Sequence, residues 1–410
     1  MPFSSPVAAD SLFQHRAFVA FWLARTCSSF GFQMLSIAVG WQIYAVTGRA
    51  LDLGLIGLAQ FLPAVVLALP AGHIADQFDR RRVVLLGQIT EWVAIVLLAT
   101  LALLHKTDEL TILGLIFVIS IAKTIEAPSL QSMLPALVPP AILARATAAN
   151  AASMQTAAML GPAIGGFLYV AGPGVVYATT GVLYFISILM VSRLRYEHAP
   201  PPRTPATFAS VFAGVKFIRN RPDVLGVISL DLFAVLLGGA TALLPIFAKD
   251  ILHTGPWGLG LLRSAPAVGG LLVGFWLSRR SLDRNVGMIM FASVAGFGVA
   301  TLVFALSREL WLSLLALFML GGFDMVSMVI RGSLVQLDTP DEMRGRVSAV
   351  NSIFINTSNQ LGEFESGLLA AWLGAVPAAA VGGIGTLIVV GLWMVWFPGL
   401  RRRQRLHHGE

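Results

Sequence analysis

The chain has 410 residues, of which 56% are hydrophobic and 12% are charged, and its formal net charge is +7. Because soluble globular proteins carry about 25% charged residues, this composition excludes an ordinary soluble domain and indicates an integral membrane protein. The excess of Lys and Arg does not indicate a nucleic-acid partner. Most of these residues fall in alternate loops, which is the pattern of the positive-inside rule.

Apolar segments long enough to span a bilayer, about 20 residues each, recur along the whole chain. They predict an all-α membrane protein with twelve transmembrane helices in two pseudo-symmetric six-helix bundles. A closed β-barrel is the other structure that can span a membrane, but the sequence lacks its short alternating segments. The predicted spans are residues 17–45, 53–74, 83–104, 110–137, 143–170, 175–193, 224–248, 257–278, 287–306, 310–336, 347–373 and 377–397.

The N-terminal segment 1–16 is polar and leads into the first span without a small-residue cleavage site, so no cleavable signal peptide is expected. Both termini are predicted to be cytoplasmic, because this placement puts the basic loops inside. The single cysteine, Cys27, lies in the first predicted helix, so no intrachain disulfide is expected.

The segment Gly72–Arg82, between the second and third spans, carries a distinctive pattern. Gly72 is expected to end a helix, Asp76 follows four residues later, and Arg80 and Arg81 open the next helix. This pattern resembles the loop between the second and third helices of the major facilitator superfamily, although two positions depart from it. The resemblance implies the major facilitator fold and a secondary transporter in which this loop is part of the gate.

The partner predicted for Asp76 is the start of the eleventh helix, near Gly345 and Arg346, and Arg344 beside them is a further gating candidate. The partial positive charge at a helix N-terminus favours a nearby carboxylate by about 0.3–1 kcal/mol. Such a contact would hold the cytoplasmic side closed and break when that side opens. The alternative is that Asp76 only caps a helix and that Arg80 and Arg81 only set the topology.

A second motif lies in the fifth predicted helix and contains Gly161, Pro162, Gly165 and Gly166. Proline removes a backbone hydrogen bond, and glycines allow bending and close helix approach. The motif resembles one that is associated with exporters of the superfamily, although the glycine that should begin it is missing. The alternative is a packing face of small residues with no bearing on transport direction.

One long polar stretch divides the predicted spans six and six. The expected organisation is an N-terminal bundle at 1–194, a cytoplasmic linker at 195–222 with an amphipathic helix at Phe208–Arg219, and a C-terminal bundle with a basic cytoplasmic tail at 223–410. The two halves also match each other at a spacing of about 200 residues, which indicates a duplication of the kind seen in transporters. Matched glycines include Gly57 with Gly260, Gly161 with Gly362, and Gly166 with Gly367.

Ionisable side chains inside a bilayer are costly, and each one is a functional candidate. A carboxylate that takes up and releases a proton as the cavity changes sides would couple transport to protons. The alternative for each is a permanent ion pair with an arginine. Lys123 is expected to pair with Glu126 on one helix face, and Arg331 to extend to the cytoplasmic surface. The coupling candidates are Asp231, Asp324 and Glu363, followed by Glu91 and Glu126.

Several runs in both halves resemble the enterobactin-exporter branch of the superfamily. They are Gly40–Tyr44, Asp231–Ala240, Thr339–Asn351 and Ser358–Gly367. Phe32 departs from the resemblance, because relatives often carry an aspartate there. The resemblance implies a proton/substrate antiporter of an inner membrane that works by alternating access. Its implied cargo is a siderophore or an amphipathic drug, the latter as in multidrug resistance. The substrate-cavity candidates are Arg25, Gln33, Trp41, Trp92, Lys123 and Asn359.

Other functions remain open at the level of sequence. A proton-coupled importer of a small metabolite is the main alternative, followed by a non-transporting membrane receptor. The tryptophans among the cavity candidates are also compatible with simple packing or an interfacial aromatic belt. No enzyme activity, metal or cofactor is expected, because the sequence contains no zinc-protease, phosphate-loop or nucleophile-elbow motif. The expected partners are a small-molecule substrate, protons and the lipid bilayer, with the protein acting as a monomer.

Overall fold

The structure, a computed structural model, describes residues 12–194, 208–280 and 284–405, and these residues form helices with no β-strand. The N-terminal half contains η1 (Leu12–Gln14), α1 (Arg16–Thr47), α2 (Ala50–Val66), α3 (Ala68–Gln77), α4 (Arg80–Leu103), α5 (Glu109–Met133), η2 (Leu134–Ala136), η3 (Pro140–Ile142), α6 (Leu143–Tyr169) and α7 (Pro173–Ser192). The C-terminal half contains α8 (Phe208–Arg219), α9 (Pro222–Leu237), η4 (Ala240–Leu243), α10 (Leu244–Ile246), η5 (Phe247–Ile251), α11 (Gly255–Leu277), α12 (Val286–Leu306), α13 (Leu310–Leu337), α14 (Asp341–Leu373), α15 (Ala375–Trp396) and α16 (Pro398–Arg402).

The helices confirm an all-α membrane protein, and each predicted span coincides with a helix or a broken helix. Eight helical segments of the described chain are long and apolar enough to cross a membrane, and the bent pair of α2 and α3 would make a ninth. The other three predicted spans correspond to α1, α6 and α14, which have 32, 27 and 33 residues but fall outside the apolar set. These helices pack against other helices of the protein, which is where polar residues in a membrane protein are tolerated. The full count of twelve spans therefore stays a prediction.

The expectation that Gly72 ends a helix is wrong. The second predicted span instead breaks near Leu67, and α3, bent by 56° from α2, carries Gly72 in its middle and Asp76 in its last turn. Only Phe78 and Asp79 separate α3 from α4. The Asp79 side chain accepts a hydrogen bond from the backbone N–H of Arg82 at 3.1 Å, which satisfies one unpaired donor at the start of α4.

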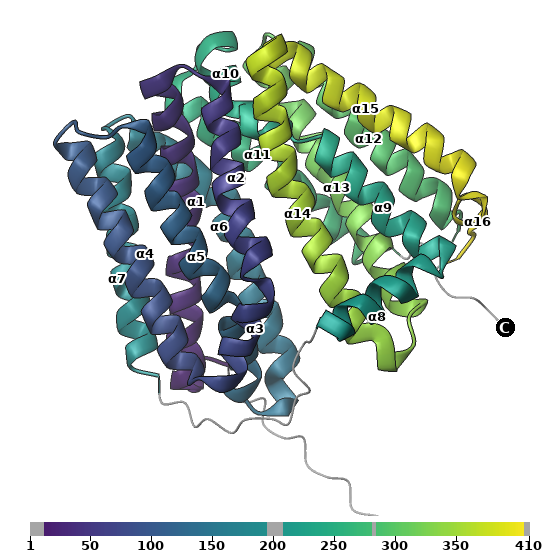
Figure 1. Ribbon diagram of the computed structural model, residues 1–410, viewed down its shortest axis with the longest axis horizontal. Helices are drawn as coiled ribbons and strands as arrows, with labels where there is room; N and C mark the ends of the chain where they lie inside the picture. Colours follow the sequence, from purple (N-terminus) through teal and green to yellow (C-terminus); the bar gives the residue numbers. More distant parts are fainter. Residues whose placement is uncertain (1–11, 195–207, 281–283, 406–410) are drawn as a thin grey trace, which may run out of the picture.

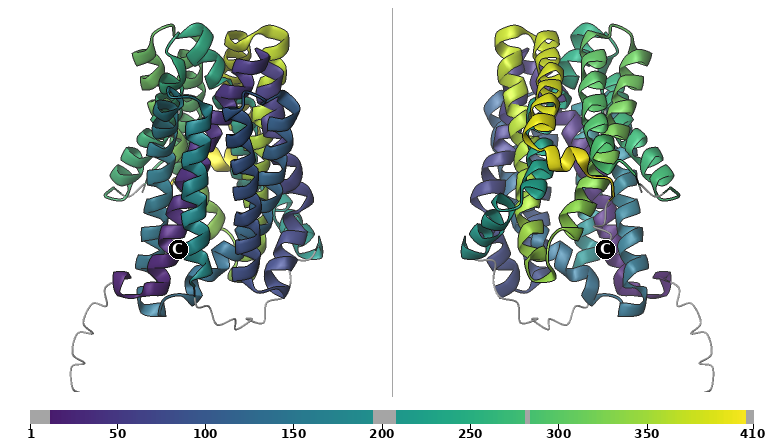
Figure 2. Two further views of the ribbon diagram at one scale, coloured as in Figure 1. Left: turned by 90° about the vertical axis from the view of Figure 1, so that its left-hand side faces the viewer. Right: turned by 90° about the vertical axis from the view of Figure 1, so that its right-hand side faces the viewer.

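In Figures 1 and 2 the helices run between an upper end, where α10 lies, and a lower end, where α3 and α8 lie. Helices α1–α7 and α9–α15 form two groups side by side (Figure 1). Of the predicted linker, residues 195–207 lie outside the described residues, whereas the predicted helix Phe208–Arg219 is present as α8. A Cβ added to Gly214 would lie 3.0 Å from the carbonyl oxygen of Arg346, so α8 packs closely on α14. The domain boundaries themselves stay a prediction.

The two halves meet along an upper interface, formed by α2 against α14 and by α6 against α11. Glycines make this approach possible. A Cβ on Gly367 would lie 2.5 Å from the Cα of Gly54, and a Cβ on Gly260 would lie 2.6 Å from the carbonyl oxygen of Pro162. Real Cβ atoms do not come this close to backbone atoms, so larger residues would separate the helices.

The matched glycines of the two halves occupy equivalent places. Gly57 of α2 faces α14 of the opposite half, and Gly260 of α11 faces α6 of the opposite half. Gly166 lies on α6 and Gly367 on α14, where they face α11 and α2. Gly161 meets α1 within the N-terminal half, and Gly362 meets α9 within the C-terminal half. The internal repeat therefore corresponds to a repeated set of helix contacts.

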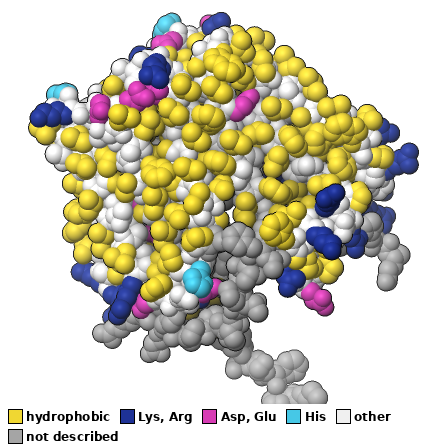
Figure 3. All heavy atoms as spheres, viewed as in Figure 1, with side chains coloured by type: hydrophobic (Ala, Val, Ile, Leu, Met, Phe, Trp, Pro, Cys, Tyr) yellow, Lys and Arg dark blue, Asp and Glu magenta, His cyan; other side chains and the backbone are white. Residues whose placement is uncertain are grey.

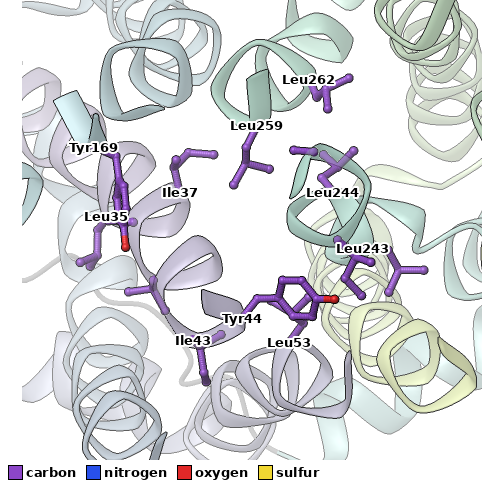
Figure 4. Close-up of a cluster of buried hydrophobic side chains, with 14 of the residues drawn as sticks. Leu35, Ile37, Ile43, Tyr44, Leu53, Tyr169, Leu243, Leu244, Leu259 and Leu262 are labelled. Carbon is purple, nitrogen blue, oxygen red and sulfur yellow. The ribbon is translucent and has the colours of Figure 1, made fainter. Parts of the chain in front are cut away.

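Among the described residues, the apolar cluster that joins the halves lies at the upper end. One cluster of buried side chains contains Leu35 and Leu53 of the N-terminal half together with Leu244 and Leu259 of the C-terminal half (Figure 4). The remaining clusters each stay within one half: one near Phe21 and Val84, the others near Phe291 and Val350. The structure is therefore closed at the upper end, and its halves are separate toward the lower end.

The outer surface fits a membrane. In the view of Figure 3, apolar side chains cover the middle of the molecule and the charged side chains gather toward its ends and edges. The exposed side chains include large apolar residues on several spanning helices, such as Leu86, Val182 and Leu272. Such a surface is stable in lipid and would be an aggregation hazard in water.

We expect Gly260→Ala to destabilise the protein, because its added Cβ has no room against the backbone of α6. Overpacking of this kind costs about 1–3 kcal/mol. The matched control is Gly332→Ala in α13, where an added Cβ meets no atom within 4 Å and should be neutral or stabilising. Thermal unfolding in detergent compares the two, and equal unfolding temperatures would contradict the close packing described.

Candidate functional site

A cavity of about 490 Å³ lies between α1, α2, α3 and α5 of the N-terminal half and α14 of the C-terminal half. It reaches Ala71 of α3 and Gln131 of α5, on the open lower side of the upper interface. Its polar lining is made of amide and hydroxyl groups, with Lys123 as the one charged side chain among the described lining residues. The lining residues with polar side chains are Gln60, Ser120, Lys123, Thr124, Gln131, Ser352, Thr357 and Gln360.

Lys123 is held at the wall of this cavity by an aromatic ring and by buried acids. Its ammonium group lies over the ring of Phe32, a contact that stabilises a cation by its interaction with the π-electrons. It also interacts electrostatically with Glu91 of α4 and Glu126 of α5. Phe32, where relatives were expected to carry an acid, thus supports a cation through its ring.

Glu91 and Glu126 lie behind Lys123 and away from solvent, with exposed fractions of 1% and 5%. The buried hydroxyl of Tyr184 is the neighbouring group that interacts with Glu91 besides Lys123 and Glu126. Arg25 of α1 interacts with Glu126 and does not line the cavity. The predicted pairing of Lys123 with Glu126 is present as an electrostatic interaction, but not as an ion pair within 4 Å in the described part of the chain. The cluster contains two cations and two acids of the N-terminal half.

Glu363 lies in a smaller cavity between the lower cavity and the upper interface. One of its oxygens is 3.8 Å from a guanidinium nitrogen of Arg263 in α11. Gln60 and Phe32 line both cavities, so the two spaces are adjacent. The structure therefore places Glu363 in an ion pair within the C-terminal half.

Asp231 forms an ion pair with Arg331, and both side chains are buried, with exposed fractions of 6% and 5%. The expectation that Arg331 extends to the membrane surface is wrong, because a buried carboxylate on α9 holds it inside the C-terminal half. Asp324 lines the same small cavity between α9, α12 and α13 as Asp231. It makes no hydrogen bond or ion pair with the described residues, so it differs from Asp231 in being available for a ligand.

Besides Arg25, the other four predicted cavity residues apart from Lys123 also do not line the lower cavity. Trp41 packs edge-on against Tyr169, and Trp92 packs against Phe185. Gln33 faces Gly161, whose added Cβ would lie 2.6 Å from the Gln33 Cβ. Asn359 is exposed and donates a hydrogen bond to the Ile355 carbonyl oxygen at 2.9 Å. For the two tryptophans, the structure matches the packing alternative.

The motif of α6 also acts through packing. Gly161 and Gly165 face α1, where an added Cβ at Gly165 would lie 3.0 Å from the Cα of Met34. Gly166 faces α11, with its added Cβ 2.5 Å from the carbonyl oxygen of Pro256. Helix α6 continues through Pro162. The small residues thus join α6 to helices of both halves.

The predicted gating arginines contact backbone oxygens at the lower end. Arg80 is buried and donates to the carbonyl oxygen of Ser132 at 3.4 Å, which ties the start of α4 to α5. Arg81 donates to the carbonyl oxygens of Val191 and Ser192 at the end of α7. Both arginines therefore hold helix ends together within the N-terminal half.

The rest of the predicted gate is separated in this conformation. Asp76 is exposed and makes no hydrogen bond or ion pair with a described residue. Arg344 pairs with Asp341 at 2.7 Å, and the side chain of Arg346 contacts the sulfur of Met343, both within α14. An added Cβ at Gly72 meets no atom within 4 Å. The contact between Asp76 and α14 stays a prediction for a conformation in which the lower end is closed.

Sequence reasoning missed the amides of the lower cavity, Gln60, Gln131 and Gln360. The amides chosen as candidates, Gln33 and Asn359, lie outside the lower cavity, although any amide in an apolar span is a sign of a polar partner. It also missed Asp52, which is fully buried near the guanidinium of Arg49 at 3.4 Å. Within the described residues, no group of three or more His, Cys, Asp or Glu side chains is placed to hold a metal ion.

We expect Arg331→Met to destabilise the protein, because it leaves the carboxylate of Asp231 buried without its partner. Breaking a buried ion pair costs about 3–5 kcal/mol, whereas replacing both partners by apolar groups is often neutral. The double variant Arg331→Met/Asp231→Leu should therefore recover much of the lost stability. Thermal unfolding measures both, and a double variant less stable than Arg331→Met would refute this account of the pair.

Comparison with known proteins identifies the family. Residues 7–404 match the family described as "Transmembrane secretion effector". The chain is 28% identical to the enterobactin exporter EntS of Citrobacter koseri over 397 residues, covering 95% of this chain and 94% of the relative. It is 27% identical to the protein of the same name from Salmonella typhi over 398 residues, with the same coverage.

Solved structures share the fold. An auto-inhibited POT family peptide transporter aligns with a TM-score of 0.75 at 13% identity, covering 96% of this chain and 98% of that one. A bacterial homologue of the human lysosomal transporter Spinster, in an inward-facing and occupied conformation, gives 0.72 at 13% identity, with coverage of 96% and 98%. The nucleoside transporter NupG gives 0.70 at 14% identity, with coverage of 93% and 99%. The chain belongs to the transmembrane secretion effector family, within the major facilitator superfamily of transporters.

Proposed function

We propose that this protein exports a siderophore-like small molecule by alternating access. The observation that carries the proposal is the cavity of about 490 Å³, which lies below a closed upper interface and displays a lysine among amides and hydroxyls. Relatives across 95% of the chain are enterobactin exporters, which supports a siderophore as the cargo. A substrate with anionic or hydroxylated groups suits this lining, because each such group finds a donor or an acceptor.

The orientation follows from charge. Basic residues dominate the lower end, for example Arg80, Arg81 and Arg219, and loops rich in Lys and Arg remain in the cytoplasm. The lower cavity then faces the cytoplasm, and both termini are cytoplasmic. In a bacterial inner membrane, this conformation would load substrate from inside the cell. The residues that line the cavity all come from one chain, so a monomer is sufficient for transport.

For the coupling ion we propose a proton, carried by the cluster around Lys123. Glu91 and Glu126 interact with Lys123, whose ammonium group lines the cavity. A proton that binds Glu91 or Glu126 changes the electrostatic environment of Lys123, and so does a substrate that binds beside Lys123. Proton binding and substrate binding can therefore affect each other. Asp324 is the next candidate, since it has no ion-pair partner within the described ranges. Asp231 and Glu363 rank lower because each is near an arginine.

The transport assay uses the purified protein in liposomes with enterobactin as the probe and an imposed pH gradient. Proton-driven accumulation is expected for the unaltered protein. Lys123→Met should reduce it by about tenfold or more, because one charge-assisted contact is worth about 1.5–3 kcal/mol. The coupling acids are tested one at a time by Glu91→Gln, Glu126→Gln and Asp324→Asn. Neutralising the acid that carries the proton should leave movement of substrate down the substrate gradient intact and abolish movement against that gradient.

The matched control is Asn359→Ala, which removes an exposed amide outside the lower cavity. It should transport as the unaltered protein does. Substrate movement unaffected by Lys123→Met would refute the assigned binding site. Full proton-driven transport by all three coupling variants would refute the assigned proton site.

The contact predicted for Asp76 has its own test. The probe is a cysteine placed at Ser352 in the cavity wall. Asp76→Asn should weaken closure of the lower end, so this cysteine should react faster with a thiol reagent added from the cytoplasmic side. The background is Cys27→Ser, since Cys27 is the single native cysteine. Unchanged reactivity together with unchanged transport would remove Asp76 from the gate.

A further inference from the structure

The upper interface contains one polar contact that differs from the rest of it. The hydroxyl of Tyr44, in the last turn of α1, donates a hydrogen bond to a carboxylate oxygen of Asp250 in η5. This is the one hydrogen bond between two side chains that crosses between the halves among the described residues. A second crossing hydrogen bond, from the Gln155 amide to the carbonyl oxygen of Ala267 at 3.1 Å, has a backbone acceptor.

Tyr44 is held firmly on the N-terminal side of this contact. Its side chain belongs to the shared apolar cluster and is 8% exposed. Figure 4 shows the hydroxyl directed toward the segment that carries Leu243. The α1 helix ends just after it, where Gly48 adopts a φ of 64° and its N–H bonds to the Tyr44 carbonyl oxygen. The ring therefore has little freedom to follow η5 if the halves move apart.

The C-terminal side of the contact is a π-helical turn, Phe247–Ile251. Such turns are rare and are frequent at functional sites. This turn presents two successive charged residues to Tyr44: Asp250 accepts the hydrogen bond from the hydroxyl, and the ammonium of Lys249 lies 5.1 Å from the centroid of the ring. The ring and the hydroxyl of Tyr44 are thus both engaged by the opposite half.

Apart from the hydrogen bond from Gln155 to the backbone of α11, the remaining contacts of the upper interface are close glycine packing and apolar burial, which have little directional preference. Helices packed in this way can separate gradually as they tilt. A hydrogen bond to a carboxylate depends steeply on distance and angle, so it distinguishes a fully closed interface from one that is partly open. Asp250 is exposed, and water can therefore replace Tyr44 when the contact breaks, which keeps the contact reversible.

We propose that Tyr44 and Asp250 are positioning residues of the transport cycle, which hold the upper end closed while the lower cavity is loaded and which separate when substrate leaves. The inference rests on alternating access as proposed above. It assigns the pair a role in the equilibrium between closed and open upper ends, without a direct contact to substrate.

The experiment measures access from the upper side. A cysteine at Ser36, in a Cys27→Ser background, lies in the smaller cavity beneath the upper interface. A membrane-impermeant maleimide added on the upper side should label it slowly. Tyr44→Phe removes one oxygen and keeps the ring, so folding should be preserved, and it should raise the labelling rate by about tenfold, the effect of one hydrogen bond to a charged group. Asp250→Ala should raise the rate to a similar extent.

The double variant Tyr44→Phe/Asp250→Ala should label no faster than the faster single variant, because residues that act through one contact are not additive. The matched control is Tyr177→Phe. It also removes a tyrosine hydroxyl, but that hydroxyl donates its hydrogen bond to Gln42 within the N-terminal half. It should leave the labelling rate unchanged. Unchanged rates in both single variants, additive effects in the double variant, or an equal effect of Tyr177→Phe would each overturn the proposal.

This assay needs no substrate. If enterobactin is not the cargo, the labelling rates still respond as described, so a wrong cargo and a wrong closing contact give different results. In the transport assay, Tyr44→Phe should lower coupled accumulation even though Tyr44 lies outside the lower cavity, because an upper end that opens too readily returns substrate to the starting side.

Discussion

The close approach of backbones at the upper interface is the constraint on which the rest of this structure depends. Gly54, Gly367, Gly166 and Gly260 leave no room for a side chain where α2 meets α14 and α6 meets α11. Because the halves touch so closely at one end, they diverge at the other, and the lower cavity occupies the space between them. Gly166 and Gly367 are matched between the two sequence halves, and Gly260 is matched with Gly57, which faces α14 from α2, so the interface is built twice from one ancestral pattern.

The sequence predicted the fold well because its signals are local. Long apolar runs define most of the helices, and the matched glycines indicate the duplication. The helices that fall outside the apolar set are α1, α6 and α14, and each of these packs against helices of both halves. The bend near Leu67 was missed because a continuous apolar run hides a change of helix direction, and so the glycine of the following motif was assigned to a helix end that lies elsewhere.

The candidate site was harder to predict, since pairing between distant helices is not visible in the sequence. Nothing near Arg331 in the sequence indicates that its partner is Asp231, about a hundred positions away. The same applies to Tyr44 and Asp250. Lys123 was identified because a lysine in the middle of an apolar span is unusual in itself. The two glutamates behind it were ranked below acids that the structure places beside arginines, because depth along a helix does not reveal which face an acid occupies.

The single cation in the lower cavity has an energetic consequence for the kind of substrate it selects. If Lys123 favours an anionic group, each export event carries negative charge out of a cell whose interior is electrically negative. Moving one elementary charge across the membrane is worth about 2.3 kcal/mol per 100 mV. The voltage alone would then drive the anion outward, and any proton entering in exchange would add to that drive. If Lys123 sets which molecules bind, as proposed, it also sets how much of the cell's stored electrical energy their export can use.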